Sequence, residues 1–179
     1  MGVSRAGSPL LPALGDIDIR TDAPQYNIHR FGEVIRQRTD IIDLWQDDFA
    51  AFALGSALTV KAALVEKGVE LRSIGRGKAL PKFRTKIMTR GAGPFDGEMV
   101  VSMRPIRQGD VDKVRALTAR FPLAHGSPIH VGEPSIIGIG DLMAPDWGDA
   151  VEIMDGDVPV FWASSLTAQH ALARAELAT

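Results

Sequence analysis

The chain has 179 residues, of which 45% are apolar and 23% are charged, and its formal net charge is -2. This size and balance are typical of one globular domain with an apolar core, and they exclude a disordered chain. The absence of cysteine excludes disulfides, thiolate metal sites and cysteine nucleophiles. No segment approaches the ~18 apolar residues that span a bilayer, and no signal-peptide core is visible. We therefore expect a cytoplasmic protein that forms a single compact domain over residues 1–179.

The N-terminal part of the chain predicts a loosely held arm, two short strands and two helices. These elements are expected over residues 1–15, 16–20, 25–31, 40–54 and 57–67. Apolar residues recur at steps of three and four from Ile41 to Phe52, with Thr39 as the N-cap, which predicts the first helix. Gly68 follows the second helix at the position that favours a left-handed residue.

The rest of the chain mixes strands and helices without internal repeats. Strands are expected over residues 69–74, 98–103, 136–139, 150–154 and 158–163, and helices over 109–121 and 166–178. The segment from 75 to 97 is rich in glycine and basic residues, which predicts a loop. Together these elements predict an α/β or α+β fold.

Charge is distributed unevenly along the chain. Seven basic residues and no acidic ones lie from Arg72 to Arg90, whereas seven acidic residues and no Lys or Arg lie from Glu133 to Asp157. These stretches indicate either two solvated surfaces that attract each other or a basic loop that receives an anionic substrate. Nucleic acid is not expected as a partner, because the basic stretch holds a single aromatic residue, Phe83, for base stacking.

The segment His125-Gly-Ser-Pro-Ile-His130 is the densest candidate for chemistry. Its glycine and proline predict a constrained loop, which can direct side chains into a pocket. Either histidine could act as a general acid or base, because imidazole titrates near neutrality. The alternative is that one or both imidazoles only hydrogen-bond the turn.

The same histidines could hold a metal ion, with Glu133 or Asp141 as a third ligand. Their spacing matches no zinc signature, so no secure cofactor is predicted, and a weakly bound divalent ion stays open. Glycine motifs for phosphates or dinucleotides and the G-x-S-x-G nucleophile motif are absent from the sequence.

Two predicted strand ends carry polar side chains. Ser102 and Arg104 end the strand expected over 98–103, and ligands collect at strand ends in open α/β sheets. Arg104 could grip a substrate carboxylate with two hydrogen bonds, or it could form a structural ion pair with the acidic stretch. Ser164 and Ser165 follow a later strand, where they could cap the final helix or help its N-terminus to bind an anion.

Seven motifs lie in order along residues 16–169 and carry a family resemblance. They read Asp18-Ile-Arg-Thr-Asp-Ala-Pro-Gln-Tyr26, Trp45-Gln-Asp-Asp-Phe49, Val100-Val-Ser-Met-Arg-Pro105, His125-Gly-Ser-Pro-Ile-His-Val-Gly132, Ile137-Gly-Ile-Gly-Asp141, Pro145-Asp-Trp-Gly-Asp149 and Val158-Pro-Val-Phe-Trp162. In these motifs the chain resembles the D-glutamate cyclase and hydro-lyase family. The resemblance implies an α/β fold in which a three-layer unit is joined to a smaller two-layer α+β subdomain, here at about residues 57–130. It also implies water loss from small carboxylated molecules, such as cyclisation of D-glutamate to 5-oxo-D-proline.

We therefore predict a lyase or cyclase that acts on a small carboxylate-bearing substrate. His125 and His130 would share the acid–base duty, Ser102 would donate a hydrogen bond, and Asp141 would orient a histidine or a metal-bound water. The predicted substrate-binding residues are Arg104, Arg84, Thr85, Ser164 and Ser165.

The chain departs from the family pattern at two places. Gly55-Ser-Ala-Leu-Thr-Val-Lys61 lacks the cysteine and the acidic residue usual there, and Trp162-Ala-Ser-Ser165 stands where Trp-Ala-Cys-Gly is usual. These changes leave two alternatives open: a small-molecule-binding homologue without catalysis, and a cyclase of a natural-product intermediate in secondary metabolism. Family members are also longer, so apolar surface left exposed here predicts a homodimer.

Overall fold

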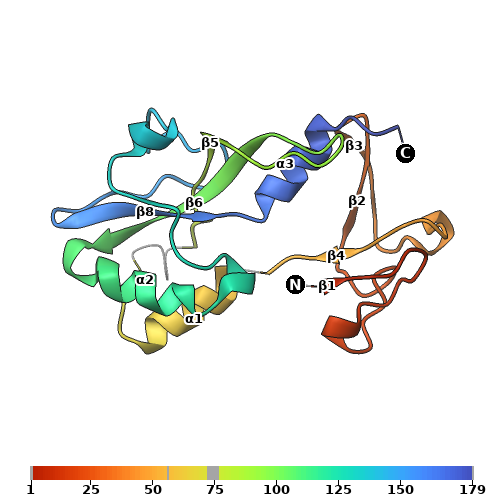
Figure 1. Ribbon diagram of the computed structural model, residues 1–179, viewed down its shortest axis with the longest axis horizontal. Coiled ribbons are helices and arrows are strands. Elements are labelled where there is room, and N and C mark those ends of the chain that lie inside the picture. Colours follow the sequence, from red (N-terminus) through yellow and green to blue (C-terminus); the bar gives the residue numbers. More distant parts are fainter. Residues whose placement is uncertain (1, 56, 72–76, 179) are drawn as a thin grey trace. The chain divides into compact units, whose positions relative to one another are not determined.

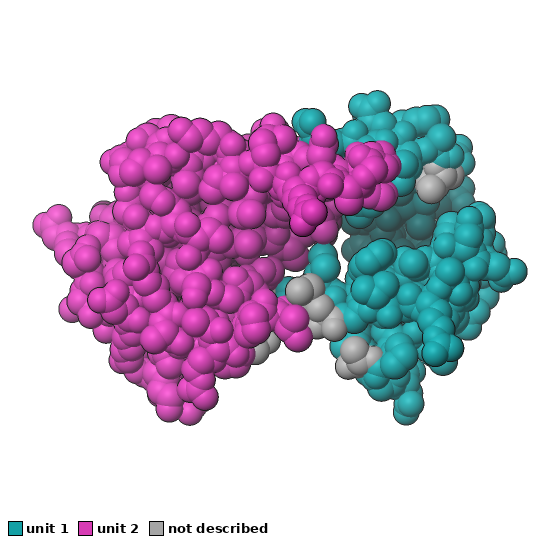
Figure 2. Space-filling view, viewed as in Figure 1, with its two compact units in different colours: residues 1–55, 172–179 teal, residues 56–171 magenta. Residues whose placement is uncertain are grey.

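The computed structural model describes residues 2–55, 57–71 and 77–178. The chain divides into two compact units, which are coloured separately in Figure 2: unit 1 comprises residues 1–55 and 172–179, and unit 2 comprises residues 56–171. Described residues of the chain mix helices and strands, which confirms the expected α/β class. The single domain with a subdomain at 57–130 stays a prediction, because compactness alone does not test independent folding.

An antiparallel four-stranded sheet forms the centre of unit 2 (Figure 1). Its strands lie in the order β5–β6–β8–β7, with the bounds β5 Lys82–Met88, β6 Glu98–Arg107, β7 His130–Val131 and β8 Asp157–Ala163. The sequence predicted β8. It predicted a loop from 75 to 97, which is wrong for residues 82–88, because these residues form β5. In β5 the apolar side chains alternate with basic ones, and Phe83 is only 2% exposed.

β6 continues through Pro105, where the sequence predicted that the strand ends. Pro105 lies opposite Pro159 of β8, and neither residue has an N–H to donate. The Met103 amide donates to the Pro81 carbonyl, on the β5 side. The Pro159 carbonyl accepts from the Gly132 amide, on the β7 side. The backbone groups of Pro105 and Pro159 therefore point away from each other, toward the outer strands. The two prolines thus interrupt none of the hydrogen bonds between β6 and β8.

Two helices, α1 Ala57–Glu66 and α2 Val111–Ala119, cover one face of the sheet (Figure 1). Both helices were expected. α1 ends in a Schellman motif, in which the amides of Val69 and Gly68 donate to the carbonyls of Leu64 and Val65, and Gly68 has a φ of 73°. We call this side of the sheet the helix-covered face, and its buried cluster comprises Val60, Leu64, Val69, Leu71, Ile106, Val111, Val114, Ala124, Val160 and Trp162.

The segment between β7 and β8 covers the opposite face. It contains the 3-10 helix η5 Pro134–Ile137, and the strands predicted over 136–139 and 150–154 are wrong. Apolar residues of this segment pack onto the sheet instead of extending it. The buried cluster on this side comprises Phe83, Val101, Met103, Ile137, Ile139 and Phe161.

Helix α3, Leu166–Arg174, follows β8 and corresponds to the predicted C-terminal helix. The Ser164 hydroxyl accepts from the Leu166 amide at 3.3 Å, so Ser164 caps the first turn. The Thr167 hydroxyl accepts from the Val100 amide and donates to its carbonyl, each at 3.1 Å, which ties α3 to β6. Among the described helices, none is long and apolar enough to cross a membrane. Two further 3-10 turns of unit 2 are η3 Gln108–Asp110 and η4 Pro122–Ala124.

Unit 1 contains two small antiparallel ribbons. One pairs β1 Gly2–Val3 with β4 Phe52–Ala53, and the other pairs β2 Tyr26–Arg30, an expected strand, with β3 Glu33–Arg38. Its 3-10 turns are η1 Pro12–Leu14 and η2 Ile42–Leu44. The loosely held arm is wrong as a description of residues 2–15, because Leu11 is 1% and Ser4 6% exposed. Residues 16–20 form turns and a single bridge rather than the expected strand.

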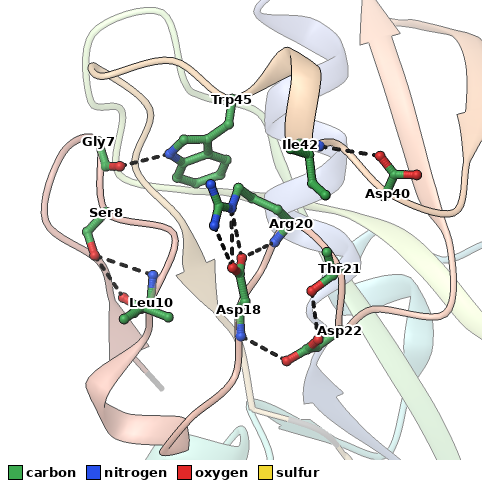
Figure 3. Close-up of polar contacts among 10 residues, drawn as sticks. All are labelled: Gly7, Ser8, Leu10, Asp18, Arg20, Thr21, Asp22, Asp40, Ile42 and Trp45. Carbon is green, nitrogen blue, oxygen red and sulfur yellow. Dashed lines mark hydrogen bonds and ion pairs between the residues drawn. The ribbon is translucent and has the colours of Figure 1, made fainter.

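The helix predicted over 40–54 is wrong, since only η2 is helical there. The aromatic residues of this segment, Trp45 and Phe49, recur at helical spacing because they contact the N-terminal segment. The Trp45 indole N–H donates to the Gly7 carbonyl at 2.8 Å, and the Trp45 ring packs edge-on against Phe49 (Figure 3). Trp45 has an extended backbone, with a ψ of 132°, so the chain leaves the helical path at this residue.

The first family motif forms a hydrogen-bonded turn in unit 1 (Figure 3). The Arg20 guanidinium binds both carboxylate oxygens of Asp18, at 3.0 and 2.7 Å. The carboxylate of Asp22 accepts from the Asp18 amide at 2.9 Å and from the Thr21 hydroxyl at 2.8 Å. The hydrogen bond from Arg20 lowers the pKa of the Asp18 carboxyl. Hydrogen bonds within the turn therefore account for the charged residues of this motif.

The motif Pro145–Asp149 binds the outer side of β5. The Asp146 carboxylate accepts from the amide and the guanidinium of Arg84, at 2.9 and 2.8 Å, and the Asp149 carboxylate accepts from the Ala79 amide at 2.7 Å. Between them, Trp147 and Lys82 exchange two backbone hydrogen bonds. The acidic and basic stretches therefore attract each other at this place, which is one of the two interpretations of the charge pattern.

Gly148 permits this contact, and replacing it should loosen the sheet. Its φ is 81°, and an added Cβ would meet the Leu80 carbonyl oxygen. We expect Gly148→Ala to lower the free energy of unfolding by about 1–3 kcal/mol, measured by urea denaturation. Gly140→Ala is the matched control, because nothing lies within 4 Å of its added Cβ. Equal stability of the two variants would contradict the steric argument.

Candidate active site

The register of the sheet places Ser102 and Arg104 on the helix-covered face. Ser102 lies opposite Trp162 of β8 and Arg104 lies opposite Val160, and both of these partners belong to the helix-covered cluster. Both residues lie in the interior of β6 and not at its end, because the strand runs to Arg107. The two polar side chains therefore point toward the same layer, two residues apart on one strand.

Ser102 is a polar residue on this largely apolar face. It is only 5% exposed, and no hydrogen bond joins its hydroxyl to any residue in the described part of the chain. Its oxygen is not fully enclosed, because it is not among the buried side-chain atoms that lack a partner. The other buried hydroxyls of the sheet differ: Thr85 donates to the Met99 carbonyl at 2.8 Å.

Arg104 brings a positive charge into apolar surroundings. Burial lowers the pKa of its guanidinium, because the charged form loses solvation. An arginine nevertheless stays protonated in proteins, and its interaction with an anion strengthens as the surrounding dielectric falls. The planar guanidinium also offers two parallel donors that match a carboxylate. This pair of residues is therefore suited to hold and polarise a small carboxylate.

The two predicted catalytic histidines lie in different surroundings. His125 follows η4 with a φ of 78°, and the preceding Ala124 packs in the helix-covered cluster. His130 lies in β7, where its ring packs against Phe161 with centroids 5.7 Å apart. Phe161 belongs to the cluster on the opposite face, so the sheet separates His130 from Ser102 and Arg104. The sheet thus separates His130 from Ser102, whereas the catalytic role of His125 stays a prediction.

The remaining predicted site residues have local structural contacts. Arg84 binds Asp146, and its guanidinium also lies 5.8 Å from the centre of the Trp147 ring. The Thr85 hydroxyl donates to the Met99 carbonyl of β6, and Ser164 caps α3. The Ser165 carbonyl accepts from the Ala168 amide in the first turn of α3. Their roles in substrate binding stay predictions.

The side chains proposed for a metal also hold turns. The Asp141 carboxylate accepts from the Met143 amide at 2.8 Å, and the Glu133 carboxylate accepts from the Ser135 amide at 3.2 Å. The His130 Nε2 lies 2.8 Å from the Glu133 carbonyl oxygen. No group of three or more His, Cys, Asp or Glu that could hold a metal occurs among the described residues. A weakly bound divalent ion stays a prediction.

Two features of the site region escaped the sequence analysis. The His170 Nε2 of α3 lies 2.9 Å from a carboxylate oxygen of Glu98, the first residue of β6. Their proximity could be found only after α3 and β6 were placed side by side. Lys82 lies directly opposite Ser102 in β5, which the glycine-rich surroundings disguised as a loop. Ser56, of the altered Gly55–Lys61 segment, lies outside the described residues.

Comparison with known proteins identifies the family. The family model described as D-glutamate cyclase matches residues 50–179. The chain belongs to the D-glutamate cyclase family.

The relatives of this D-glutamate cyclase family member carry a common name. A protein of Jannaschia sp. (strain CCS1) named "Putative hydro-lyase" is 52% identical over 99% of this chain and 67% of its own length. A protein of Bordetella pertussis with the same description is 47% identical over 97% of this chain and 63% of its length. Another, from Dinoroseobacter shibae, is 51% identical over 98% and 59%. The chain thus spans about two thirds or less of the length of these relatives.

A mutation pair tests whether the fold depends on the Ser102 hydroxyl. We expect Ser102→Ala to change the free energy of unfolding by less than about 0.5 kcal/mol, because no hydrogen bond to a described residue is lost with the hydroxyl. Thr118→Val is the control, since the Thr118 hydroxyl accepts from the Trp162 indole at 3.4 Å and is fully buried. This variant should lose about 1–2 kcal/mol. Urea denaturation measures both, and a clear loss in Ser102→Ala would contradict the assignment.

Proposed function

We propose that this D-glutamate cyclase family member acts on a small carboxylate substrate in a lyase or cyclase reaction on the helix-covered face. The observation that carries the proposal is the placement of Ser102 and Arg104, two largely buried polar residues, two positions apart on one strand and on the same face of the sheet. Arg104 would bind the carboxylate with two hydrogen bonds, and Ser102 would donate a third. The names of the family and of its relatives support water loss as the type of reaction.

Cyclisation of D-glutamate illustrates the chemical demand on these residues. A bond forms between the amine nitrogen and the side-chain carboxyl carbon, one carbon–oxygen bond breaks, and water leaves. Negative charge grows on the carboxyl oxygens while the nitrogen attacks, and the Arg104 charge and the Ser102 hydroxyl would stabilise it. In all, the ammonium must lose two protons to become the amide N–H, and the leaving carboxylate oxygen must gain two to depart as water.

His125 is the histidine that we propose for this proton transfer. It follows Ala124, which packs in the helix-covered cluster, whereas His130 contacts Phe161 on the other face. A single imidazole can carry these protons one after the other from the nitrogen to the leaving oxygen, because imidazole exchanges protons readily near neutral pH. His130 would then serve the loop through its contact with the Glu133 carbonyl.

Arg104 should be required for turnover of the substrate. Proton NMR of D-glutamate with the protein, with and without a divalent ion, would follow formation of 5-oxoproline. We expect Arg104→Met to lower kcat/KM by at least about 100-fold, because the oxygens lose their charged donor. Arg107→Met is the control on the same strand, as Arg107 is exposed and pairs with Glu70 at 3.4 Å. Its effect should stay within about twofold. Equal activity of both variants would contradict the proposed site.

His125→Ala separates the acid–base role from carboxylate binding. We expect kcat to fall by about 10²–10⁴-fold while KM changes little, because the histidine would act on protons and not on the bound carboxylate. His130→Ala, the matched variant on the opposite face, should retain most of the activity. Unchanged turnover in His125→Ala would remove this residue from the mechanism, and carboxylate binding without any turnover in the wild type would indicate a binding protein.

Three broader expectations accompany the proposal. We propose a cytoplasmic protein that assembles as a homodimer, and light scattering of the purified chain would test the assembly. A place in secondary metabolism is a further proposal, which a screen of cyclic natural-product intermediates would test. Each is independent of the Arg104 assignment.

A further inference from the structure

The β2–β3 ribbon of unit 1 carries its charged residues on one face only (Figure 1). Residues that lie opposite each other in an antiparallel pair share a face, and side chains alternate along each strand. One face, which we call the outer face, comprises Asn27, His29, Val34 and Gln37. The inner face comprises every Arg and Glu of the two strands, with two apolar or aromatic residues: Tyr26, Ile28, Arg30, Glu33, Arg36 and Arg38. Ile35 is the extra residue of a bulge.

The usual distribution of polarity is inverted in this ribbon. All residues of the outer face are exposed, whereas Tyr26, Ile28 and Arg38 of the inner face are half-buried. A ribbon that faces water on one side normally carries its charged residues on that side. Here the exposed side has no Lys, Arg, Asp or Glu, and its Val34 is 50% exposed. Depletion of charge distinguishes the centre of a protein interface from the rest of the surface, so the outer face is suited to contact a protein.

Contacts within unit 1 explain why the inner face carries the charges. The Arg38 guanidinium binds both carboxylate oxygens of Asp43, at 3.0 and 2.8 Å. This hydrogen bond, together with the charge of Arg36, lowers the pKa of the Asp43 carboxyl. The Tyr26 hydroxyl accepts from the Ala23 amide at 3.0 Å. These contacts hold the inner face toward the rest of unit 1 and leave the outer face to water.

Apolar side chains extend the outer face at the tip of the ribbon. Phe31 and Gly32 form its two-residue turn, and both have a positive φ, 49° and 81°. Asn-Gly is favoured in such turns, and a bulky residue with positive φ is strained. The Phe31 amide donates to the Leu177 carbonyl at 2.9 Å, which holds the turn in place. The Phe31 ring is 61% exposed and Ile35 is 54% exposed, so the tip presents an aromatic side chain to water at a cost in strain.

A second copy of this chain fits the outer face better than a charged partner does. A face without Lys, Arg, Asp or Glu neither repels its own copy nor attracts an oppositely charged protein. Asn27 and Gln37 lie opposite each other, and each amide carries donors and an acceptor, so the pair can hydrogen-bond to the same pair of another copy. Two ribbons stacked tip over tip, about a two-fold axis along the ribbon, would bring amides against amides and Val34 against apolar residues.

We infer that the chain dimerises through the outer face of the β2–β3 ribbon, with side chains rather than strand edges in contact. The inference rests on the proposed homodimer, whose surface it names, and it is independent of the proposed reaction. One face of two short strands is smaller than the about 800 Å² per partner that a stable interface buries. The tip residues must therefore contribute, and we expect a weak dimer with a Kd in the micromolar range.

Opposite charges placed at Val34 test this surface in the full chain. Sedimentation velocity or light scattering would follow association over about 1–500 μM protein, a range that spans the expected Kd. We expect Val34→Lys and Val34→Glu each to raise the dimer Kd by about tenfold or more, because like charges meet near the two-fold axis. An equimolar mixture of the two variants should associate to within about threefold of the wild type, since opposite charges then meet. Val65→Lys is the matched control, because Val65 of α1 is 49% exposed, and it should change the Kd by less than about twofold.

Phe31→Asn separates the surface from the fold. Asn-Gly suits the turn, so the urea midpoint of the dilute variant should not fall. Loss of the ring should raise the dimer Kd by about fivefold or more. A dimer whose Kd none of these variants changes would overturn the assignment of the surface but not the homodimer. A monomer over the whole concentration range would overturn both. Weaker association of the Val34 variants with a lower urea midpoint and no recovery in the mixture would also overturn the surface, because loss of the fold would then explain it.

Discussion

The antiparallel pairing of β6 with β8 determines which side chains reach the candidate site. Its register joins Ser102 to Trp162 and Arg104 to Val160, so both polar residues face the layer of α1 and α2. A slip of one residue would turn them to the opposite face, because side chains alternate along a strand. The pairing of Pro105 with Pro159 opposes such a slip, since a shifted proline would stand where the ladder needs an N–H.

The same face combines stability and binding in adjacent rows. Trp162 lies opposite Ser102 and is 4% exposed, and its indole N–H donates to the buried Thr118 hydroxyl of α2. The fully buried Val160 lies opposite Arg104. A rigid apolar base therefore lies beside the two polar residues of the candidate site.

Sequence patterns predicted most of unit 2 and less of unit 1. The helix that ends at Gly68 was predictable, because helical periodicity and a left-handed C-terminal residue agreed. β5 was missed because its alternating apolar residues stand among lysines, arginines and glycines. In residues 40–54 the helical spacing of Trp45 and Phe49 had a different cause, a distant contact with Gly7 that no local pattern contains. Local rules fail where tertiary contacts decide the backbone.

The candidate site was predictable in its residue types but not in its grouping. Ser102 and Arg104 were identified because a hydroxyl and a guanidinium stood in an apolar strand. The sequence grouped His125 with His130 in one loop motif, which does not reveal that His130 lies on the face opposite Ser102. Lys82 could not be paired with Ser102 without the register of a strand that the sequence had not predicted.

The contacts of the Pro145–Asp149 motif also limit how the sheet can associate with other chains. An outer strand normally exposes amides that a strand of another molecule can bind, which is a route to aggregation. Here the amides of Ala79, Lys82 and Arg84 are occupied by Asp149, Trp147 and Asp146. The strand at the other edge, β7, is only two residues long. The sheet thus offers little backbone for growth at either edge, and any assembly of copies would have to use side-chain surfaces.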